Sequence, residues 1–213
     1  SIRFSKNSYK KPALPENSDQ AAFLFLEPST RTQLSFGLAA QKLGINVHQL
    51  YPEGSSLNKG ETLLDTLLNL EAMGFNSTVI RLKEEKLLSQ IKSQLKSMSL
   101  ICAGEGKISH PSQALLDACT IFEHFKRLDN LKILFLGDIE HSRVYASNLS
   151  WLQKYNNEVF ALSPSKNCLT KISDNSVQTG AWDNFLGDFD VIVMLRPQLE
   201  RYDNQSQTNL TEY

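Results

Sequence analysis

The chain has 213 residues and a mass of 24.0 kDa, a length that accommodates one large domain or two small ones. Hydrophobic residues make up 41% and charged residues 21%, as is typical of a globular protein. Twenty-two basic against 23 acidic residues leave a formal charge of −1, which gives no support for binding to nucleic acid or to a membrane surface. We therefore expect any anionic ligand to be held by a few local cations.

The cysteines and the hydropathy of the chain indicate the cellular compartment in which it is expected. Cysteines occur at three widely spaced positions, which favours a reducing cytoplasm over a disulfide framework or a metal site; they are Cys102, Cys119 and Cys168. No stretch approaches the ~18 consecutive apolar residues of a membrane span. The opening SIRFSKNSYKK has no apolar core of a signal peptide. We predict a cytoplasmic protein without a bound metal or cofactor.

Apolar and amphipathic runs alternate from the start of the chain. An apolar run at 23–26 predicts a buried strand, and 30–43 carries leucines at helical spacing, between an N-cap at Ser29 and a terminating Gly44. Further strands are expected at 45–51, 77–82 and 100–103, and further helices at 60–73, 84–96 and 111–126.

The alternation resumes after a polar stretch at 124–130. Strands are expected at 132–136, 159–162 and 190–195, with a helix at 142–155. This pattern predicts an α/β fold of two doubly wound domains, with parallel sheets flanked by helices. We place the domains at 1–123 and 124–213, joined by an interdomain helix, and expect 202–213 to be a loop.

The first candidate site directly follows the strand at 23–26. The segment 27–32 reads EPSTRT and opens a helix, where backbone N–H groups and the helix dipole attract anions. Its hydroxyls and its guanidinium are donors that suit a phosphate; they belong to Ser29, Thr30, Arg31 and Thr32. The alternative is a plain helix cap with one solvated arginine.

Two more candidates follow in the same half of the chain. A polar loop places Ser56 and Lys59 just before a helix, although a lone lysine there is usually solvated. Arg81 ends the strand at 77–82, and ligands of parallel α/β sheets bind beyond the carboxyl ends of strands.

The segment HPSQ at 110–113 follows another strand and opens another helix. His110 is expected at the helix N-terminus, which favours a neutral imidazole that can polarise a carbonyl through its one N–H. A histidine that only caps the helix is the alternative. The other histidines lack such a context and are interpreted as structural or surface residues: His48, His124 and His141.

The placement of arginine indicates the class of ligand. Four of the seven arginines fall at strand ends: Arg31, Arg81, Arg143 and Arg196. Arginine favours bidentate recognition of carboxylate and phosphate, so the pattern predicts small, polyanionic substrates. The sequence contains no clustered metal ligands, no dinucleotide or P-loop glycine motif and no nucleophile elbow.

These motifs resemble, in order, those of the aspartate/ornithine carbamoyltransferase family. The matching segments are STRT at 29–32, KGET at 59–62, HPSQ at 110–113 and RPQ at 196–198. The resemblance runs from about residue 23 to residue 201, and the first and third segments are specific to the whole family. Lys59 and the RxQ segment resemble the aspartate branch rather than the ornithine branch.

The resemblance implies transfer of the carbamoyl group from carbamoyl phosphate to the amine of L-aspartate, in pyrimidine biosynthesis and without a cofactor. It also implies a homotrimer, in which Lys59 and Ser56 reach the active site of a neighbouring subunit. A regulatory subunit or a fusion partner is compatible with it. The alternatives are an ornithine-type or other-amine carbamoyltransferase, and a non-catalytic carbamoyltransferase-like subunit.

Each matching residue receives a role from the resemblance. The catalytic set is Arg31, Thr32, Lys59, Arg81 and His110. The phosphate would be held by Ser29, Thr30, Arg31 and Thr32. The carbonyl oxygen would be faced by Thr32, Arg81 and His110, and the amide of carbamoyl phosphate by Gln113. The carboxylates of aspartate would be held by Arg143 and Arg196, with Gln198 beside Arg196.

Some features depart from the family pattern. Gln33 stands where the family usually repeats arginine, and Pro197 removes one backbone N–H within the RxQ segment. The second domain is expected to be incomplete, because the sequence stops before the family's later proline-containing loop. We also expect the first helix of the first domain to be missing, and therefore either part of a longer chain or a truncated relative.

Overall fold

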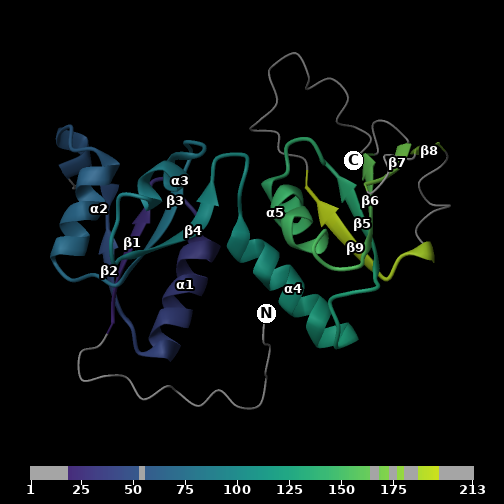
Figure 1. The fold of residues 1–213 in the computed structure, drawn as a ribbon, viewed down its shortest axis with the longest axis horizontal. Coiled ribbons are helices and arrows are strands. Elements are labelled where there is room, and N and C mark those ends of the chain that lie inside the picture. The colour runs from purple at the N-terminus through teal and green to yellow at the C-terminus, as the bar shows by residue number, and fades with distance from the viewer. Residues whose placement is uncertain (1–18, 53–55, 164–167, 173–176, 180–186, 197–213) are drawn as a thin grey trace. The chain divides into compact units, whose positions relative to one another are not determined.

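The computed structural model describes residues 19–52, 56–163, 168–172, 177–179 and 187–196. The chain forms two compact units that divide between Gly106 and Lys107. Each unit contains one sheet with helices beside it (Figure 1). The predicted α/β fold class is confirmed, because strands and helices alternate through both units.

The sheet of the first unit is parallel throughout, in the strand order β2-β1-β3-β4. Its strands are β1 (Gln20–Phe25), β2 (Asn46–Leu50), β3 (Ser77–Leu82) and β4 (Ser99–Glu105). The chain leaves β1 toward β2 at one edge and then returns to the opposite side of β1 to form β3. This reversal creates a topological switch point between β1 and β3, where doubly wound folds bind ligands.

Side chains of β1 alternate between two cores, because successive residues of a strand face opposite sides of the sheet. Ala22 and Leu24 join a core with α2 (Leu63–Ala72) and α3 (Leu87–Lys92). Phe23 belongs to a second core with α1 (Thr30–Leu43). Helices thus cover both faces, as a buried parallel sheet requires.

Local signals set the helix ends in this unit. Gly44 closes α1 at φ 72°, a left-handed conformation that glycine adopts without strain. Thr62 caps α2, because its hydroxyl oxygen accepts a backbone N–H of the first turn at 3.1 Å. The helix α3 is shorter than the predicted 84–96. Its downstream segment turns away and donates three backbone N–H groups, those of residues 96–98, to the Glu71 carboxylate at 2.6–2.8 Å.

The second unit contains α4 (Pro111–Phe125), α5 (Arg143–Leu152) and a sheet in the order β8-β7-β6-β5-β9. Its strands are β5 (Lys132–Gly137), β6 (Glu158–Ser163), β7 (Cys168–Lys171), β8 (Val177–Thr179) and β9 (Val191–Leu195). The first of them, β5, pairs in parallel with β6 on one side and β9 on the other, which creates a second switch point between β5 and β9. The strands β7 and β8 add an antiparallel edge, which was not predicted because such short segments carry no apolar periodicity.

The two faces of β5 are buried by different partners. On one face, the ring of Phe135 packs edge-on against Tyr145 of α5, with ring centroids 5.1 Å apart. On the other, Leu134 and Leu136 cluster with Phe160, Leu162 and the nearby Phe189. The burial of both faces explains why the sequence of β5 reads as a continuous apolar run.

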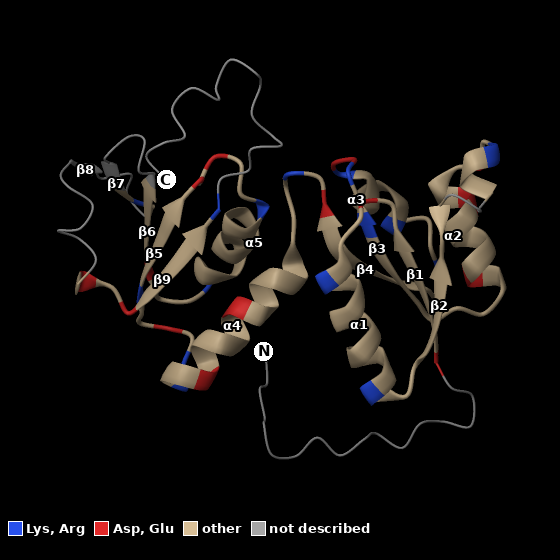
Figure 2. Ribbon diagram, turned by 180° about the vertical axis from the view of Figure 1, so that it is seen from behind, with Lys and Arg blue, Asp and Glu red and all other residues tan. Residues whose placement is uncertain are grey.

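Helix α4 packs along α5 and belongs to the second compact unit (Figures 1 and 2). The backbone N–H of His110 donates to Ser147 Oγ at 2.7 Å, and Asn148 Nδ2 donates to Asp117 Oδ2 at 2.6 Å. The division at 106/107 therefore lies before α4, whereas the sequence analysis places the boundary at 123/124. The domain boundary at 123/124 stays a prediction.

Predicted and observed bounds agree best where the sequence signals are strongest. The strand at 77–82 and the helix at 30–43 have the predicted bounds, and α4 begins at the predicted Pro111. The helix predicted at 60–73 begins later, because residues 56–59 form a short 3-10 helix, η2 (Ser56–Lys59), ahead of it. The loop predicted at 202–213 lies outside the described residues.

Candidate functional site

The loop after β1 and the end of β3 meet at the first switch point. Phe25 and Arg81 are register partners on the two strands. The backbone N–H groups of Leu26 and Glu27 both donate to the carbonyl oxygen of Arg81, at 2.8 and 3.3 Å. These bonds fix the turn that leads into α1, so the helix begins at the carboxyl end of the sheet. Its first N–H groups lack acceptors within their own helix and carry the positive end of the helix dipole.

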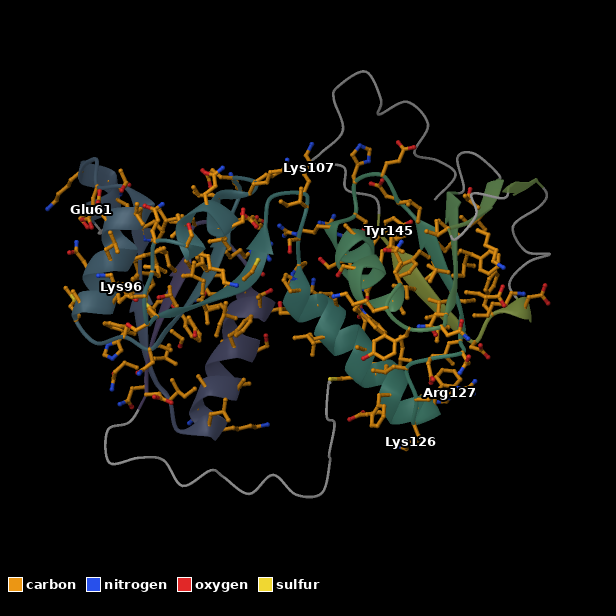
Figure 3. The ribbon with its side chains drawn as sticks, viewed as in Figure 1. Glu61, Lys96, Lys107, Lys126, Arg127 and Tyr145 are labelled. Atoms are coloured by element: carbon orange, nitrogen blue, oxygen red, sulfur yellow. The ribbon has the colours of Figure 1, made fainter. Side chains whose placement is uncertain are left out.

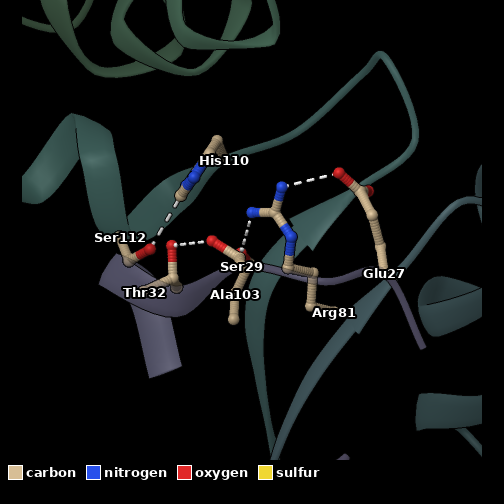
Figure 4. Close-up of polar contacts among 7 residues, drawn as sticks. All are labelled: Glu27, Ser29, Thr32, Arg81, Ala103, His110 and Ser112. Atoms are coloured by element: carbon tan, nitrogen blue, oxygen red, sulfur yellow. Dashed lines mark hydrogen bonds and ion pairs between the residues drawn. The ribbon is translucent and has the colours of Figure 1, made fainter. Parts of the chain in front are cut away.

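The first turn of α1 gathers the donors predicted to bind phosphate. Ser29 occupies the predicted N-cap position, but its side chain does not cap the helix. Instead, Ser29 Oγ donates to Thr32 Oγ1 at 2.9 Å (Figure 4). Thr30 and Arg31 are exposed, and Ser29 and Thr32 are half-buried. Three hydroxyls and one guanidinium therefore occupy one accessible turn at the positive end of a helix.

Arg81 is buried, with 6% of its surface exposed, and two partners fix its guanidinium. Its Nη2 forms an ion pair with Glu27 Oε1 at 2.6 Å, and its Nη1 donates to the carbonyl oxygen of Ala103 at 3.1 Å (Figure 4). Arg81 and the segment that begins with Glu27 were both predicted site elements, but their ion pair was not, because it joins residues 54 positions apart. The structure thus anchors a positive charge at the switch point.

The loop that carries Lys59 is folded on itself before α2. Backbone N–H groups of Gly60 and Glu61 donate to the carbonyl oxygens of Leu57 and Ser56 at 3.3 and 3.2 Å. A hydrogen bond from the Ser56 side chain is the main cause that lowers the pKa of the Glu61 carboxyl, which lies beside α2 (Figure 3). Ser56 is therefore engaged with a neighbour in its own loop, and Lys59 is exposed.

In the second unit, His110 occupies the N-cap position of α4, as predicted. Its backbone is held by the bond to Ser147, and its ring Nδ1 lies 3.3 Å from Ser112 Oγ (Figure 4). Pro111 takes the first helical position, where its fixed φ suits the helix and its missing N–H has no role. The half-buried imidazole is thus positioned by contacts to its backbone and to its ring.

Gln113 lies in the first turn of the same helix and contacts a side chain that the sequence analysis did not single out. Its Nε2 donates to Asp117 Oδ1 at 2.9 Å. The other oxygen of Asp117 accepts from Asn148, whose own oxygen accepts from Trp151 Nε1 at 3.0 Å. The spacing of four residues between Gln113 and Asp117 is a signal that could have indicated this contact.

The loop between β5 and α5 is fixed by a buried carboxylate. Asp138 Oδ1 lies 2.8 Å from His141 Nδ1 and accepts the His141 backbone N–H at 3.3 Å. Ser142 caps α5, because its oxygen accepts the backbone N–H of Tyr145 at 3.2 Å. Burial raises the pKa of the Tyr145 hydroxyl (Figure 3). Arg143, the first residue of α5, directly follows this loop and is only 7% exposed.

The second switch point is narrow because Gly137 ends β5 without a side chain. Gly137 pairs with Leu195 of β9, and a Cβ at Gly137 would lie 2.1 Å from the carbonyl oxygen of Leu195. Its φ of 126° is also unfavourable for other residues. Arg196 follows Leu195 and is exposed, and the predicted Gln198 lies outside the described residues.

Charge is not segregated in the described parts of the chain. Basic and acidic segments are mixed over both units (Figure 2). Within the described ranges, no group of three or more His, Cys, Asp and Glu side chains could hold a metal ion. Among the helices that the structure describes, none has the length and apolarity needed to cross a bilayer.

Comparison with known proteins decides the family. The family model described as "Aspartate/ornithine carbamoyltransferase, carbamoyl-P binding domain" matches residues 2–123. The chain belongs to the aspartate/ornithine carbamoyltransferase family. The aspartate carbamoyltransferase catalytic subunit of Streptococcus equi subsp. zooepidemicus is 38% identical over 213 residues, which cover 99% of this chain and 68% of that subunit.

Two further carbamoyltransferases support this assignment. The aspartate carbamoyltransferase catalytic subunit of Sulfurimonas denitrificans is 38% identical over 191 residues, covering 89% of this chain and 64% of that subunit. The crystal structure of aspartate transcarbamoylase from Trypanosoma cruzi, in complex with carbamoyl aspartate and phosphate, matches with a TM-score of 0.73 at 29% identity. This match covers 86% of this chain and 64% of that one. The chain thus spans about two thirds of the length of these relatives.

Within each unit, the structure brings only some of the predicted residues to the switch point, and His110 and Gln113 lie instead at the start of α4. In the first unit, the α1 turn and Arg81 come together at the ends of β1 and β3. In the second, Arg143 and Arg196 follow the two strands that flank the switch point, β5 and β9. Ser56 and Lys59 belong to η2, which precedes α2 and does not directly follow β1, β3, β5 or β9 in the sequence.

Proposed function

We propose that the protein transfers the carbamoyl group of carbamoyl phosphate to the α-amine of L-aspartate, giving N-carbamoyl-L-aspartate and phosphate for pyrimidine biosynthesis. The observation that carries this proposal is the cluster of Ser29, Arg31 and Thr32 on the first turn of α1, next to the anchored Arg81. Support also comes from the Trypanosoma cruzi relative, whose structure contains carbamoyl aspartate and phosphate, the two products of this reaction.

The α1 turn suits the phosphate of carbamoyl phosphate. Backbone N–H groups at a helix N-terminus point at an anion, and the helix dipole favours negative charge there. Arg31 is exposed and can bind two phosphate oxygens through its planar guanidinium. The Ser29 O–H donates to Thr32 Oγ1, so Ser29 orients the Thr32 hydroxyl, whose own O–H can donate to the same anion.

The chemical step places negative charge on the carbonyl oxygen when the amine attacks the carbonyl carbon. Donors that are already fixed in place stabilise that charge without reorganisation. Glu27 and Ala103 hold the Arg81 guanidinium in one position, which gives such a fixed charge. His110 adds an N–H donor if its Nδ1 accepts from Ser112, because the proton of the neutral ring then resides on Nε2.

The amine substrate requires groups that bind carboxylates. Arg143 and Arg196 follow the strands at the second switch point, and both are assigned to the two carboxylates of aspartate. No covalent nucleophile is required, because the departing phosphate can accept the proton of the amine. Catalysis is then largely the positioning of two anions and the stabilisation of one developing oxyanion.

The test is the formation of N-carbamoyl-L-aspartate by the whole protein from carbamoyl phosphate and L-aspartate. A parallel reaction with L-ornithine identifies the amine specificity. We expect product with aspartate and none with ornithine. Product with ornithine alone would move the assignment to the ornithine branch, and no turnover with either amine would favour a non-catalytic binding subunit.

We further propose a homotrimer in which Lys59 and Ser56 act in the site of a neighbouring subunit. The exposed position of Lys59 on η2 suits such a role. Lys59→Ala and His110→Ala proteins, each inactive alone, should regain activity when their subunits are mixed and exchanged. The same proteins incubated separately are the control, and no recovery despite demonstrated exchange would overturn the shared site.

We also propose a cytoplasmic location, which is checked by cell fractionation.

A further inference from the structure

Side chains of α4 and α5 form a single chain of hydrogen bonds in the second unit. Trp151 Nε1 donates to Asn148 Oδ1 at 3.0 Å, and Asn148 Nδ2 donates to Asp117 Oδ2 at 2.6 Å. The other Asp117 oxygen accepts from Gln113 Nε2 at 2.9 Å. The two helices lie side by side in both views (Figures 1 and 2), so this chain of bonds links α5 to the first turn of α4.

The direction of every bond in this chain is determined by chemistry. An indole N–H can only donate, so Trp151 selects the oxygen of the Asn148 amide. The Asn148 Nδ2 also donates to the carbonyl oxygen of Val144 at 3.1 Å, a group that can only accept. Ionised Asp117 accepts on both oxygens, from Asn148 on one and from Gln113 on the other. Gln113 must therefore direct its Nε2 toward Asp117.

This constraint fixes which end of the Gln113 amide faces Asp117 and which end faces away from it. Reversing its amide would set Gln113 Oε1 against Asp117 Oδ1, two acceptors that cannot form a hydrogen bond. Asn148 is 1% exposed and has partners for both ends of its amide, so it cannot reverse to compensate. Gln113 Oε1 accepts no hydrogen bond from the described residues and is presented as an acceptor on the first turn of α4.

We propose that Asp117, supported by Asn148, is a positioning residue that makes Gln113 select an acyl phosphate carrying an N–H group. This inference rests on the proposed function, in which Gln113 faces the amide of carbamoyl phosphate. The amino group of carbamoyl phosphate donates to Gln113 Oε1, whereas acetyl phosphate offers a methyl group at the same place. A site built to accept an N–H disfavours an analogue that lacks it, because the acceptor then stays unpaired.

The direct test is Asp117→Asn in the whole protein. Asparagine has only one oxygen, so it can accept from Asn148 or from Gln113 but not from both through side-chain oxygens. Because Asn148 is fixed by Trp151 and Val144, Gln113 is expected to lose its acceptor and reverse. The KM for carbamoyl phosphate should rise about three- to tenfold, the effect of one lost hydrogen bond. The inhibition constant of inorganic phosphate, which has no amino group, should change less than about twofold on the same scale.

A double-mutant cycle separates positioning from a general structural effect. In a Gln113→Ala background, Asp117→Asn should raise the KM for carbamoyl phosphate no further, because the residue through which it acts is gone. Asp129→Asn removes a carboxylate of the same unit that contacts Asn130 instead, and is the matched control. Equal weakening of carbamoyl phosphate and inorganic phosphate, or an undiminished effect in the Gln113→Ala background, would overturn the proposal.

A second variant and a second readout keep the outcome clear. If Asp117→Asn does not fold, Asn148→Ala should shift the KM in the same direction by a smaller factor, and a folded Asn148→Ala protein without such a shift contradicts the proposal. Calorimetric affinities for carbamoyl phosphate, acetyl phosphate and inorganic phosphate give the same comparison without turnover. Failure of the proposed function appears as a wild-type protein without activity, whereas failure of this inference leaves an active wild type whose ligand preference Asp117→Asn does not change.

Discussion

Each of the two sheets begins with a strand, a loop and a helix, and in each segment a serine is followed by an arginine. The two segments differ in whether the serine caps the helix and whether the arginine is exposed. After β1, the Ser29 side chain leaves the helix uncapped and donates to Thr32, and Arg31 is exposed. After β5, Ser142 caps α5 in the usual way and Arg143 is buried. A serine followed closely by an arginine therefore forms an open turn in one unit and a closed, internally satisfied turn in the other.

The difference teaches what each turn can do for a ligand. The β1–α1 turn exposes Arg31 and the backbone N–H groups of a helix N-terminus, which suit an external anion such as the phosphate of the proposed substrate. In the β5–α5 turn, Asp138 fixes the loop through its bonds to His141, and the arginine that follows is buried. Preorganisation reduces the entropy lost on binding. The first turn is thus expected to govern affinity for one substrate, and the second to govern the geometry of the other.

Arg31→Ala should have the largest effect and test the open turn. Removing one partner of a charge-assisted site costs about 2–5 kcal/mol of binding free energy, so affinity for carbamoyl phosphate should fall by well over tenfold. The measurement is calorimetric binding of carbamoyl phosphate, with the exposed Arg127 (Figure 3) changed to alanine as the control. A loss of less than tenfold would contradict the phosphate assignment of the α1 turn.

Asp138→Asn should test the closed turn through stability rather than affinity. This carboxylate is 3% exposed, and weakening its bonds to His141 leaves a buried polar group poorly paired. The free energy of unfolding should fall by about 1–3 kcal/mol, measured by urea denaturation. Glu140→Gln, at an exposed position in the same loop, should change it by less than about 0.5 kcal/mol. Equal effects of the two variants would argue against the conclusion that Asp138 fixes this loop.

The two serines offer a matched pair with smaller effects. Ser142→Ala removes a true helix cap and should lower the free energy of unfolding by about 1 kcal/mol. Ser29→Ala removes no cap, so its stability should stay within about 0.5 kcal/mol of the wild type, while the KM for carbamoyl phosphate rises. Urea denaturation and initial rates distinguish the two results. The comparison fails if Ser29→Ala is the more destabilising variant.

The smallest expected effect is on the pH dependence of stability, and it concerns Glu71 of the first unit. Backbone hydrogen bonds from Ser97 and then Met98 are the main causes that lower the pKa of Glu71 from its ordinary 4.5 to about 2. A carboxyl with a lowered folded-state pKa stabilises the protein above its ordinary pKa, and this stabilisation is lost as pH falls toward the folded value. The stability difference between wild type and Glu71→Gln should thus be present at pH 7 and shrink between pH 4.5 and about 2. Urea denaturation across this range measures it, with Glu84→Gln as the control, and a difference that is independent of pH would refute the assignment.

The sequence predicted most of the backbone but only part of the site. Local signals were sufficient for α1, where Gly44 ends a leucine-spaced helix, and for β3. Long-range contacts were not predictable, because no local pattern states that Glu27 pairs with Arg81 or that Asn148 meets Asp117. The antiparallel strands β7 and β8 were missed for the related reason that their pairing, rather than their short sequences, defines them.

Gly137 has a consequence for experiments that vary the residues at the end of β9. Because Gly137 has no side chain, the Leu195 carbonyl can approach β5 closely. This approach sets the position of the backbone just before Arg196. A substitution at 137 would displace the end of β9 and with it Arg196, which we propose to bind a carboxylate of aspartate. Libraries that test the proposed role of Arg196 should therefore keep position 137 constant, because the distance between the backbones of β5 and β9 sets where Arg196 begins.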